Sequence, residues 1–283
     1  MTILLCSVNT LSVRRALLGL LVWGLVPFSA VVEAGPSEGR LLGYLSSKIA
    51  HSPDNAELYL RRAYSFAEIG HMKDAFADLR RVERLGHGES ANFARGELLR
   101  RAGRLEAARR KFDQVLVENP RHYQALMKRA EVLVSLGKNA DALADYQRLF
   151  QVRPNSASGY YRQAAELYLA SGAPEQALAL LDTRMAATGP IPQLQNLAIS
   201  IEQTQGRYAA AIVRMKALSA ASHSSPFWHS KTAALYYSDG DIDRARHHIA
   251  IAENLLAQRR QTPAVIDQLN TELLPLKKRL ASQ

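Results

Sequence analysis

Residues 130–146, which read AEVLVSLGKNADALADY, decide how this chain folds. The small residue Ala130 is followed at regular intervals by Gly137, by a second small residue, Ala142, and by the large side chain of Tyr146. Small side chains let two helix backbones approach closely, and glycine readily adopts the left-handed conformation that ends a helix. The stretch therefore predicts two helices that cross at the alanines and are joined by a turn at Gly137.

The same pattern recurs along most of the chain with a period of about 34 residues. Its units are about Ala56–Gly88, Glu89–His122 and Tyr123–Ser156, and three more that begin at Ala157, Ile191 and Pro226. In each unit the second helix carries an alanine at the expected crossing, namely Ala75, Ala108, Ala142, Ala177, Ala211 and Ala245. Recurrence in phase predicts a stack of helix pairs in which each unit packs mainly on its neighbours.

This pattern resembles the tetratricopeptide-repeat (TPR) family. The unit Tyr123–Ser156 carries Leu126, Ala130, Leu133, Gly137, Ala142, Tyr146 and Pro154 at the signature positions of that family. The resemblance implies an all-α superhelical solenoid of about six helix-turn-helix repeats over residues 56–256. We expect a capping helix and linker over residues 35–55 and a second capping helix within residues 257–283. Pro275 is expected to kink or split this last helix.

The first residues have the pattern of a secretory signal peptide. Arg14 and Arg15 precede an apolar run over residues 16–32, and small residues flank Glu33 in Val32-Glu33-Ala34. We expect cleavage after Ala34, which implies a periplasmic or secreted protein. An uncleaved leader that anchors the chain in the inner membrane is the alternative, and general secretory and twin-arginine export both remain open. No further apolar run is long enough to predict a membrane span.

Composition removes several functional classes. The formal net charge is +10, but Lys and Arg alternate with Glu and Asp and form no long basic run, so nucleic acid is not an expected partner. The one cysteine, Cys6, lies in the leader, which leaves no disulfide or thiol nucleophile after cleavage. No nucleotide-binding, metalloprotease or serine-hydrolase motif is present. We expect neither an enzyme nor a cofactor.

The resemblance implies a concave groove lined by the first helix of each unit. The corresponding positions here are Arg61, Tyr64, Phe93, Glu97, Arg100, Arg101, Lys128, Glu131, Tyr161, Arg162, Tyr168, Asn196, Glu202, Gln203, Lys231 and Tyr237. Four basic residues, Arg61, Lys128, Arg162 and Lys231, share one offset within their units. A line of cations beside aromatic rings suits an acidic peptide, and the expected function is a protein-binding scaffold of the bacterial envelope.

Two alternatives remain at the groove. Its residues could be ordinary solvated helix positions, or the groove could bind a polysaccharide or another polyanion during export. Whether the partner binds this groove or the convex face, and whether the chain is an oligomer, are also open.

Near the carboxyl end, four histidines are close in sequence: His223, His229, His247 and His248. They could meet in one unit and bind a metal, but we expect surface histidines and no metal site.

Overall fold

The computed structural model describes residues 36–218, 223–258 and 262–282, and within these ranges it contains helices and no strand. The helices are α1 (Pro36–His51), α2 (Ala56–Glu68), α3 (Met72–Arg84), α4 (Gly88–Arg101), α5 (Leu105–Glu118), α6 (Tyr123–Ser135), α7 (Asn139–Val152), α8 (Ser158–Ala170), α9 (Pro174–Thr188), α10 (Pro192–Thr204), α11 (Tyr208–Lys216), α12 (Pro226–Ser238), α13 (Ile242–Gln258) and α14 (Pro263–Ala281). The all-α fold class is confirmed. The signal peptide over residues 1–34 lies outside the described residues and stays a prediction.

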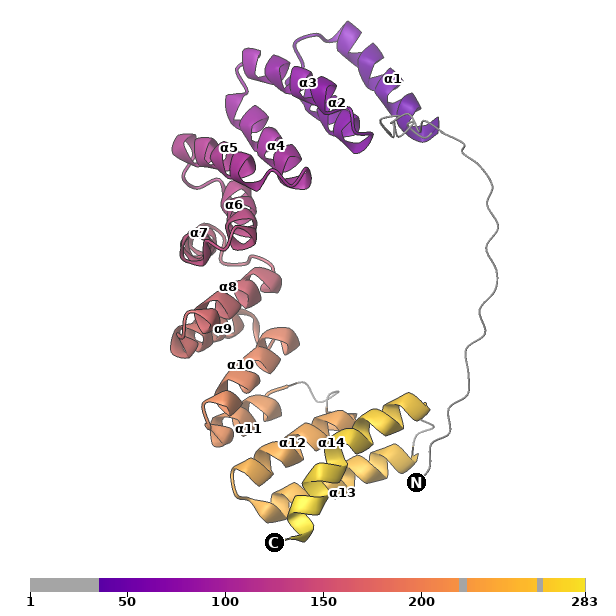
Figure 1. The fold of residues 1–283 in the computed structure, drawn as a ribbon, viewed down its shortest axis with the longest axis vertical. Coiled ribbons are helices and arrows are strands. Elements are labelled where there is room, and N and C mark those ends of the chain that lie inside the picture. The colour runs from indigo at the N-terminus through magenta and orange to yellow at the C-terminus, as the bar shows by residue number, and fades with distance from the viewer. Residues whose placement is uncertain (1–35, 219–222, 259–261, 283) are drawn as a thin grey trace, which may run out of the picture.

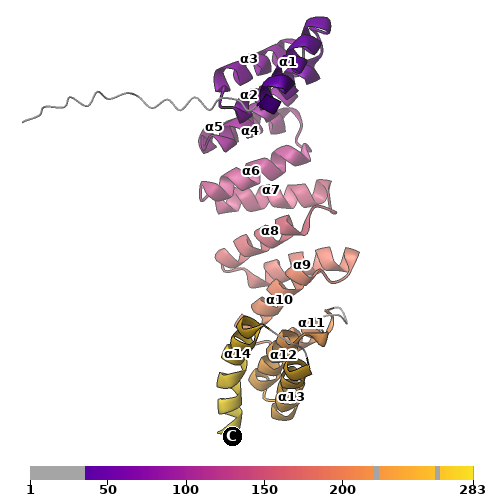
Figure 2. The same ribbon diagram turned by 90° about the vertical axis from the view of Figure 1, so that its right-hand side faces the viewer.

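The helices form antiparallel pairs that stack into an open arc (Figure 1). The pairs α2–α3, α4–α5, α6–α7, α8–α9, α10–α11 and α12–α13 pack closely, and each also contacts the next pair. In Figure 1, α4, α6 and α8 lie toward the hollow side of the arc, and α5, α7 and α9 lie toward the outside. Figure 2 shows the pairs following one another along the long axis. The predicted repeat units are these pairs.

The packing inside a pair follows from the pattern that predicted it. Ala130 and Ala142 are fully buried where α6 and α7 cross, and Gly137 turns the chain between them with φ +72°. The second unit has Gly96 in place of the first alanine. A Cβ at Gly96 would lie 2.6 Å from the ring of Phe112, so the missing side chain makes room for that ring.

The second helix of the fifth pair, α11, is shorter at its carboxyl end than the second helices of the other pairs. Helix α11 stops at Lys216, which leaves backbone carbonyls at its carboxyl end to be satisfied by side chains. The indole Nε1–H of Trp228 donates to the carbonyl of Met215 at 3.2 Å, and the amide of Gln195 donates to the carbonyl of Arg214 at 2.8 Å. The sixth unit is thus joined to the fifth by a side chain of α12.

Capping helices lie at both ends of the described arc. Helix α1 packs on α2, and α14 packs on α12 and α13. Of the kink or split predicted at Pro275, the split does not occur, because α14 runs without a break from Pro263 to Ala281; the kink stays a prediction. A proline inside a helix costs about 3 kcal/mol. Burial of Leu269 before Pro275 and of Leu280 after it holds both halves against the same neighbours and offsets that cost. None of the described helices is long and apolar enough to cross a bilayer.

Candidate functional site

A hollow lies between the inner helices α6 and α8. It is lined by Glu131, Val134, Ser135, Tyr146, Arg162, Gln163, Glu166 and Leu167. Tyr146 reaches it from α7, and its hydroxyl donates to Oε1 of Gln163 at 2.7 Å. Val134 is 40% exposed, although it is a large apolar residue. The hollow therefore offers apolar surface beside charged side chains, which is the composition of a site that receives a peptide side chain.

Three of the four residues in the basic line form ion pairs inside their own helices. The pairs are Arg61–Glu57 at 2.9 Å, Lys128–Glu131 at 3.1 Å and Arg162–Glu166 at 2.5 Å. The fourth residue, Lys231, is exposed on α12. Pairs of this kind contribute little to stability when they are exposed to water. The Lys128–Glu131 pair is partly buried, whereas Arg61 and Arg162 lie in exposed pairs and can exchange one carboxylate for another without a large cost.

The first two inner helices meet through predicted groove residues. The guanidinium of Arg101 on α4 lies over the ring of Tyr64 on α2, 6.0 Å from its centroid, and Arg100 donates to Glu97 at 3.2 Å. Burial, followed by the charge of Glu97, raises the pKa of Tyr64. The side chains of Tyr64, Glu97 and Arg101 therefore lie together across the seam between the first and second units.

Several predicted groove residues belong to the core instead. Tyr161 is only 4% exposed, its ring stacks on Phe150 at 3.8 Å, and its hydroxyl donates to the carbonyl of Pro154. Glu202 is also buried, where it pairs with two arginines. Its partners are Arg207 and Arg214. The family mapping is wrong at Tyr161 and Glu202 because neighbouring helices cover these positions.

The remaining predicted groove residues differ in how far they are buried. Phe93 is partly buried and packs on Phe112 and His122. The hydroxyl of Tyr168 accepts a hydrogen bond from the amide of Gln147 at 2.6 Å, Tyr237 packs against the last core cluster, and Asn196 and Gln203 are exposed on α10. Of the predicted groove residues, Glu131 and Arg162 line the α6–α8 hollow, and the residues of the later units lie apart from it.

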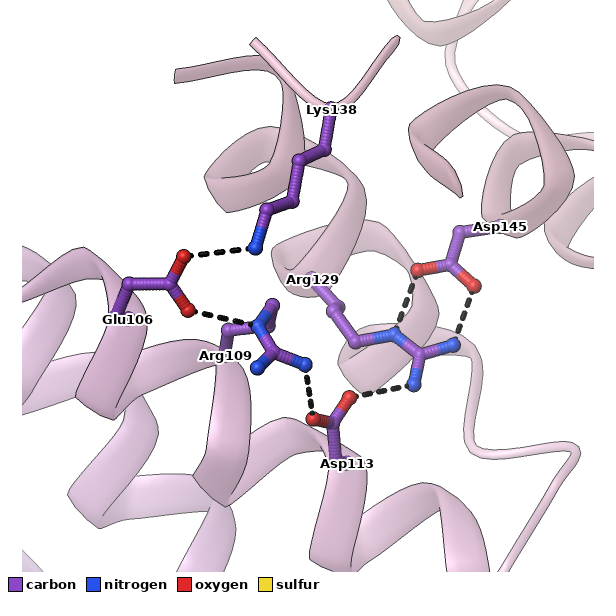
Figure 3. Close-up of polar contacts among 6 residues, drawn as sticks. All are labelled: Glu106, Arg109, Asp113, Arg129, Lys138 and Asp145. Atoms are coloured by element: carbon purple, nitrogen blue, oxygen red, sulfur yellow. Dashed lines mark hydrogen bonds and ion pairs between the residues drawn. The ribbon is translucent and has the colours of Figure 1, made fainter. Parts of the chain in front are cut away.

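The sequence reasoning missed a buried ion-pair clamp between units. Both Nε–H and Nη2–H of Arg129 donate to the carboxylate of Asp145, at 2.7 and 2.6 Å, and Nη1–H donates to Asp113 at 2.8 Å (Figure 3). Burial acts to lower the pKa of Arg129, but hydrogen bonds and attraction to Asp145 and Asp113 outweigh it and raise the pKa. One guanidinium on α6 therefore ties together α5 and α7.

The clamp continues along α5 to the turn before α7. Arg109 bonds both Asp113 and Glu106, and Glu106 also accepts from Lys138 at 2.7 Å (Figure 3). Each carboxylate of this network has a cationic partner. We therefore interpret the network as a contact that holds the second and third units together.

The first unit repeats the clamp in shorter form. Arg62 donates through two nitrogens to Asp78, both at 2.8 Å, and through a third to Ser46 of α1. In both clamps the acid follows the arginine by 16 residues, as the hydrogen-bond separations show. An Arg before the first alanine and an Asp before the large residue of the second helix is the sequence signal that would have found them.

Two of the four histidines meet in the last unit. Nδ1 of His229 on α12 lies 2.9 Å from Nδ1 of His248 on α13. His229 is only 7% exposed, so the prediction of a surface histidine is wrong at this position. Among the residues that the structure describes, no group of three or more metal-binding side chains converges.

Comparison with known proteins agrees with the repeat pattern. A family model described as Tetratricopeptide repeat matches residues 93–158. The chain is 28% identical over 212 residues to DnaJ homolog subfamily C member 3 of Gallus gallus, which covers 75% of this chain and 37% of that protein. The chain therefore spans less than two fifths of the length of this curated relative.

Solved structures share the fold at low sequence identity. The C-terminal part of a TPR repeat-containing protein from Cytophaga hutchinsonii has a TM-score of 0.61 at 12% identity, covering 82% of this chain and 94% of that one. A chain in the structure of Naa15/Naa10 bound to HypK-THB has a TM-score of 0.50 at 15% identity, covering 84% of this chain and 39% of that one. These similarities show a common TPR architecture.

Proposed function

We propose that this chain, whose residues 93–158 match the tetratricopeptide-repeat family model, is a non-enzymatic scaffold that binds an extended segment of a partner protein along its inner helices. The observation that carries the proposal is the hollow between α6 and α8, where exposed Val134 and partly buried Leu167 lie beside the Arg162–Glu166 ion pair. The similar Naa15/Naa10 structure is itself a protein assembly.

The chemistry of the hollow suggests what the partner presents. An apolar side chain would contact Val134 and Leu167, and a flanking carboxylate would replace Glu166 on Arg162. Binding would then remove apolar area from water while conserving the number of charge pairs. The alternative of a polyanion ligand has less support, because three of the four basic-line residues are already paired with glutamates.

We place the scaffold in the bacterial cell envelope, as the leader suggests. The proposal predicts that the chain recovered from its native source begins at Gly35. Amino-terminal sequencing of that chain tests it, and a mature protein that begins at Met1 would contradict cleavage and favour an anchored leader.

A matched pair of valine substitutions tests the site. Val134 lies on an inner helix and Val117, which is 81% exposed, lies on the outer helix α5. We expect Val134→Arg to weaken capture of the partner at least tenfold, because a charge replaces an apolar contact, whereas Val117→Arg leaves capture unchanged. Affinity capture from envelope fractions, quantified by mass spectrometry, measures the difference.

Equal capture by wild type and Val134→Arg would exclude the hollow as the binding site. Loss of capture with Val117→Arg alone would assign binding to the outer face. Circular dichroism of both variants verifies that each keeps its helices.

A further inference from the structure

The paired imidazoles of His229 and His248 form a hydrogen bond whose geometry restricts their protonation. Nε2 of His229 lies 2.9 Å from the backbone carbonyl of His223, and a carbonyl only accepts, so Nε2 carries a proton. In the neutral ring Nδ1 of His229 is then an acceptor, and His248 donates to it through its own Nδ1–H at 2.9 Å. If both rings were cationic, two N–H groups would face each other and the bond would break.

The surroundings oppose even the first added proton. Lys216 of α11 lies over the ring of Tyr236, 5.7 Å from its centroid. Arg244 of α13 lies over the same ring at 5.5 Å, but its charge is paired with Asp241 at 3.3 Å, so Lys216 is the cation that acts on His248. The Tyr236 ring stacks on His248 at 5.4 Å.

Two further histidines face the pair. His247 lies 5.7 Å from His248 between ring centroids, and His223 stands on the preceding turn. From α14, Glu272 accepts from Ser230 at 3.0 Å, and it is not among the charges that shift the pKa of either ring. The rings are thus surrounded by positive and titratable groups.

The pair lies where the fifth unit is joined to the sixth. His229 fixes the turn through the carbonyl of His223, and the neighbouring Trp228 caps the end of α11 through the carbonyl of Met215. The indole ring contacts both His223, at 4.3 Å, and His229, at 4.9 Å, between ring centroids. Loss of the imidazole bond would therefore act on the seam between α11 and α12.

We propose that the His229–His248 pair is a proton-operated latch, which holds the turn at His223 and helix α12 in place at neutral pH and releases them on acidification. The geometry of the two rings, their burial and their cationic surroundings all act in this direction. Release would loosen the last unit relative to the first five.

The pH window follows from the direction of the shifts. Burial, followed by the charges of His229, His247 and Lys216, lowers the pKa of His248 to about 4, and burial likewise lowers the pKa of His229. A histidine ring released into water has a pKa of about 6.5. Between that pH and about pH 4, the released state therefore binds more protons than the latched state. The latched state is fully favoured above that window and is lost as the pH falls through it.

Hydrogen exchange of the full-length chain, measured by mass spectrometry and corrected for the intrinsic pH dependence, tests the latch. From about pH 7 to about pH 5, we expect exchange in α12 to rise of the order of tenfold relative to α6 in the wild type. His248→Asn keeps a side-chain N–H near the donor position but removes one of the two titrating rings, so its rise in α12 exchange should be clearly smaller than that of the wild type. The matched control His87→Asn, at the start of α4 where the ring makes no cap, should behave as wild type.

His248→Lys places a permanent charge at the same site and should open α12 already at about pH 7. Constant α12 exchange in the wild type, or an equal rise in wild type and His248→Asn, would overturn the proposal. A His248→Lys variant that exchanges as slowly as wild type at about pH 7 would do the same. Circular dichroism at about pH 7 verifies that His248→Asn is folded.

Discussion

Single residues decide whether two helices can approach closely enough to form a unit. In the second unit the aromatic ring of Phe112 occupies space that an alanine would fill at Gly96. Phe112 is itself fully buried and contacts Phe93, so it has little freedom to move away. Small and large residues at this crossing are therefore matched as a pair.

We expect Gly96→Ala to destabilise the protein by about 1–3 kcal/mol, because the new methyl group overpacks against Phe112. The matched control is Gly159→Ala, where nothing lies within 4 Å of the added Cβ. That change should be neutral or stabilise the helix by about 0.5–1 kcal/mol. Urea unfolding followed by circular dichroism compares the two. Similar free energies of unfolding for both variants would show that the ring can move aside.

Buried ion pairs between helices fix the relative position of helices that apolar packing also holds together. Arg129 has an 18% exposed side chain and Asp145 a 3% exposed one, and they form a two-bond pair. The fourth unit has Gln163 and Leu180 at the corresponding positions, so a unit also forms without this clamp. The clamp therefore occurs in the first and third units, and the fold does not require it.

We expect Asp145→Asn to destabilise the protein by about 3 kcal/mol, because it leaves Arg129 without its principal counter-charge. Asp141→Asn, at an exposed position in the same helix, should cost less than about 1 kcal/mol. The double variant Arg129→Gln, Asp145→Leu copies the fourth unit and should recover most of the loss. A double variant as unstable as Asp145→Asn would show that the clamp is needed at this position. Thermal unfolding of the three variants gives the comparison.

Across the whole molecule, the core is a chain of adjoining clusters. One cluster joins α4 to α8, and another joins α10 to α14. Because each unit contacts mainly its neighbours, stability is expected to be local and to differ between the two ends. The latch and the cap helix α14 both lie in the last cluster.

We expect Leu269→Ala to destabilise α12–α14 by about 2–5 kcal/mol, since Leu269 is fully buried, while hydrogen exchange in α2–α7 stays unchanged. Leu274→Ala on the same helix is the control, because Leu274 is 52% exposed and its loss should have little effect. Equal loss of protection in every helix would show that the molecule unfolds as one cooperative body.

The sequence by itself determined the helix pairs, their order and their close crossings. Helix periodicity and the sizes of residues such as Ala130, Gly137 and Tyr146 act over short distances along the chain, so their consequences can be predicted locally. Their in-phase recurrence then allowed only a stacked, all-helical arrangement.

Tertiary structure alone decided which side chains meet and which remain exposed. Tyr161 and Glu202 occupy predicted groove positions but are covered by neighbouring helices, and His229 joins a histidine on another helix instead of facing water. Arg162, the residue after Tyr161, and Lys231 at the matching position of the sixth unit stay exposed. The cause is that burial and ion pairing depend on the distance between helices in space. Spacing along the sequence fixes where a residue sits in its own helix but not what the next helix places against it.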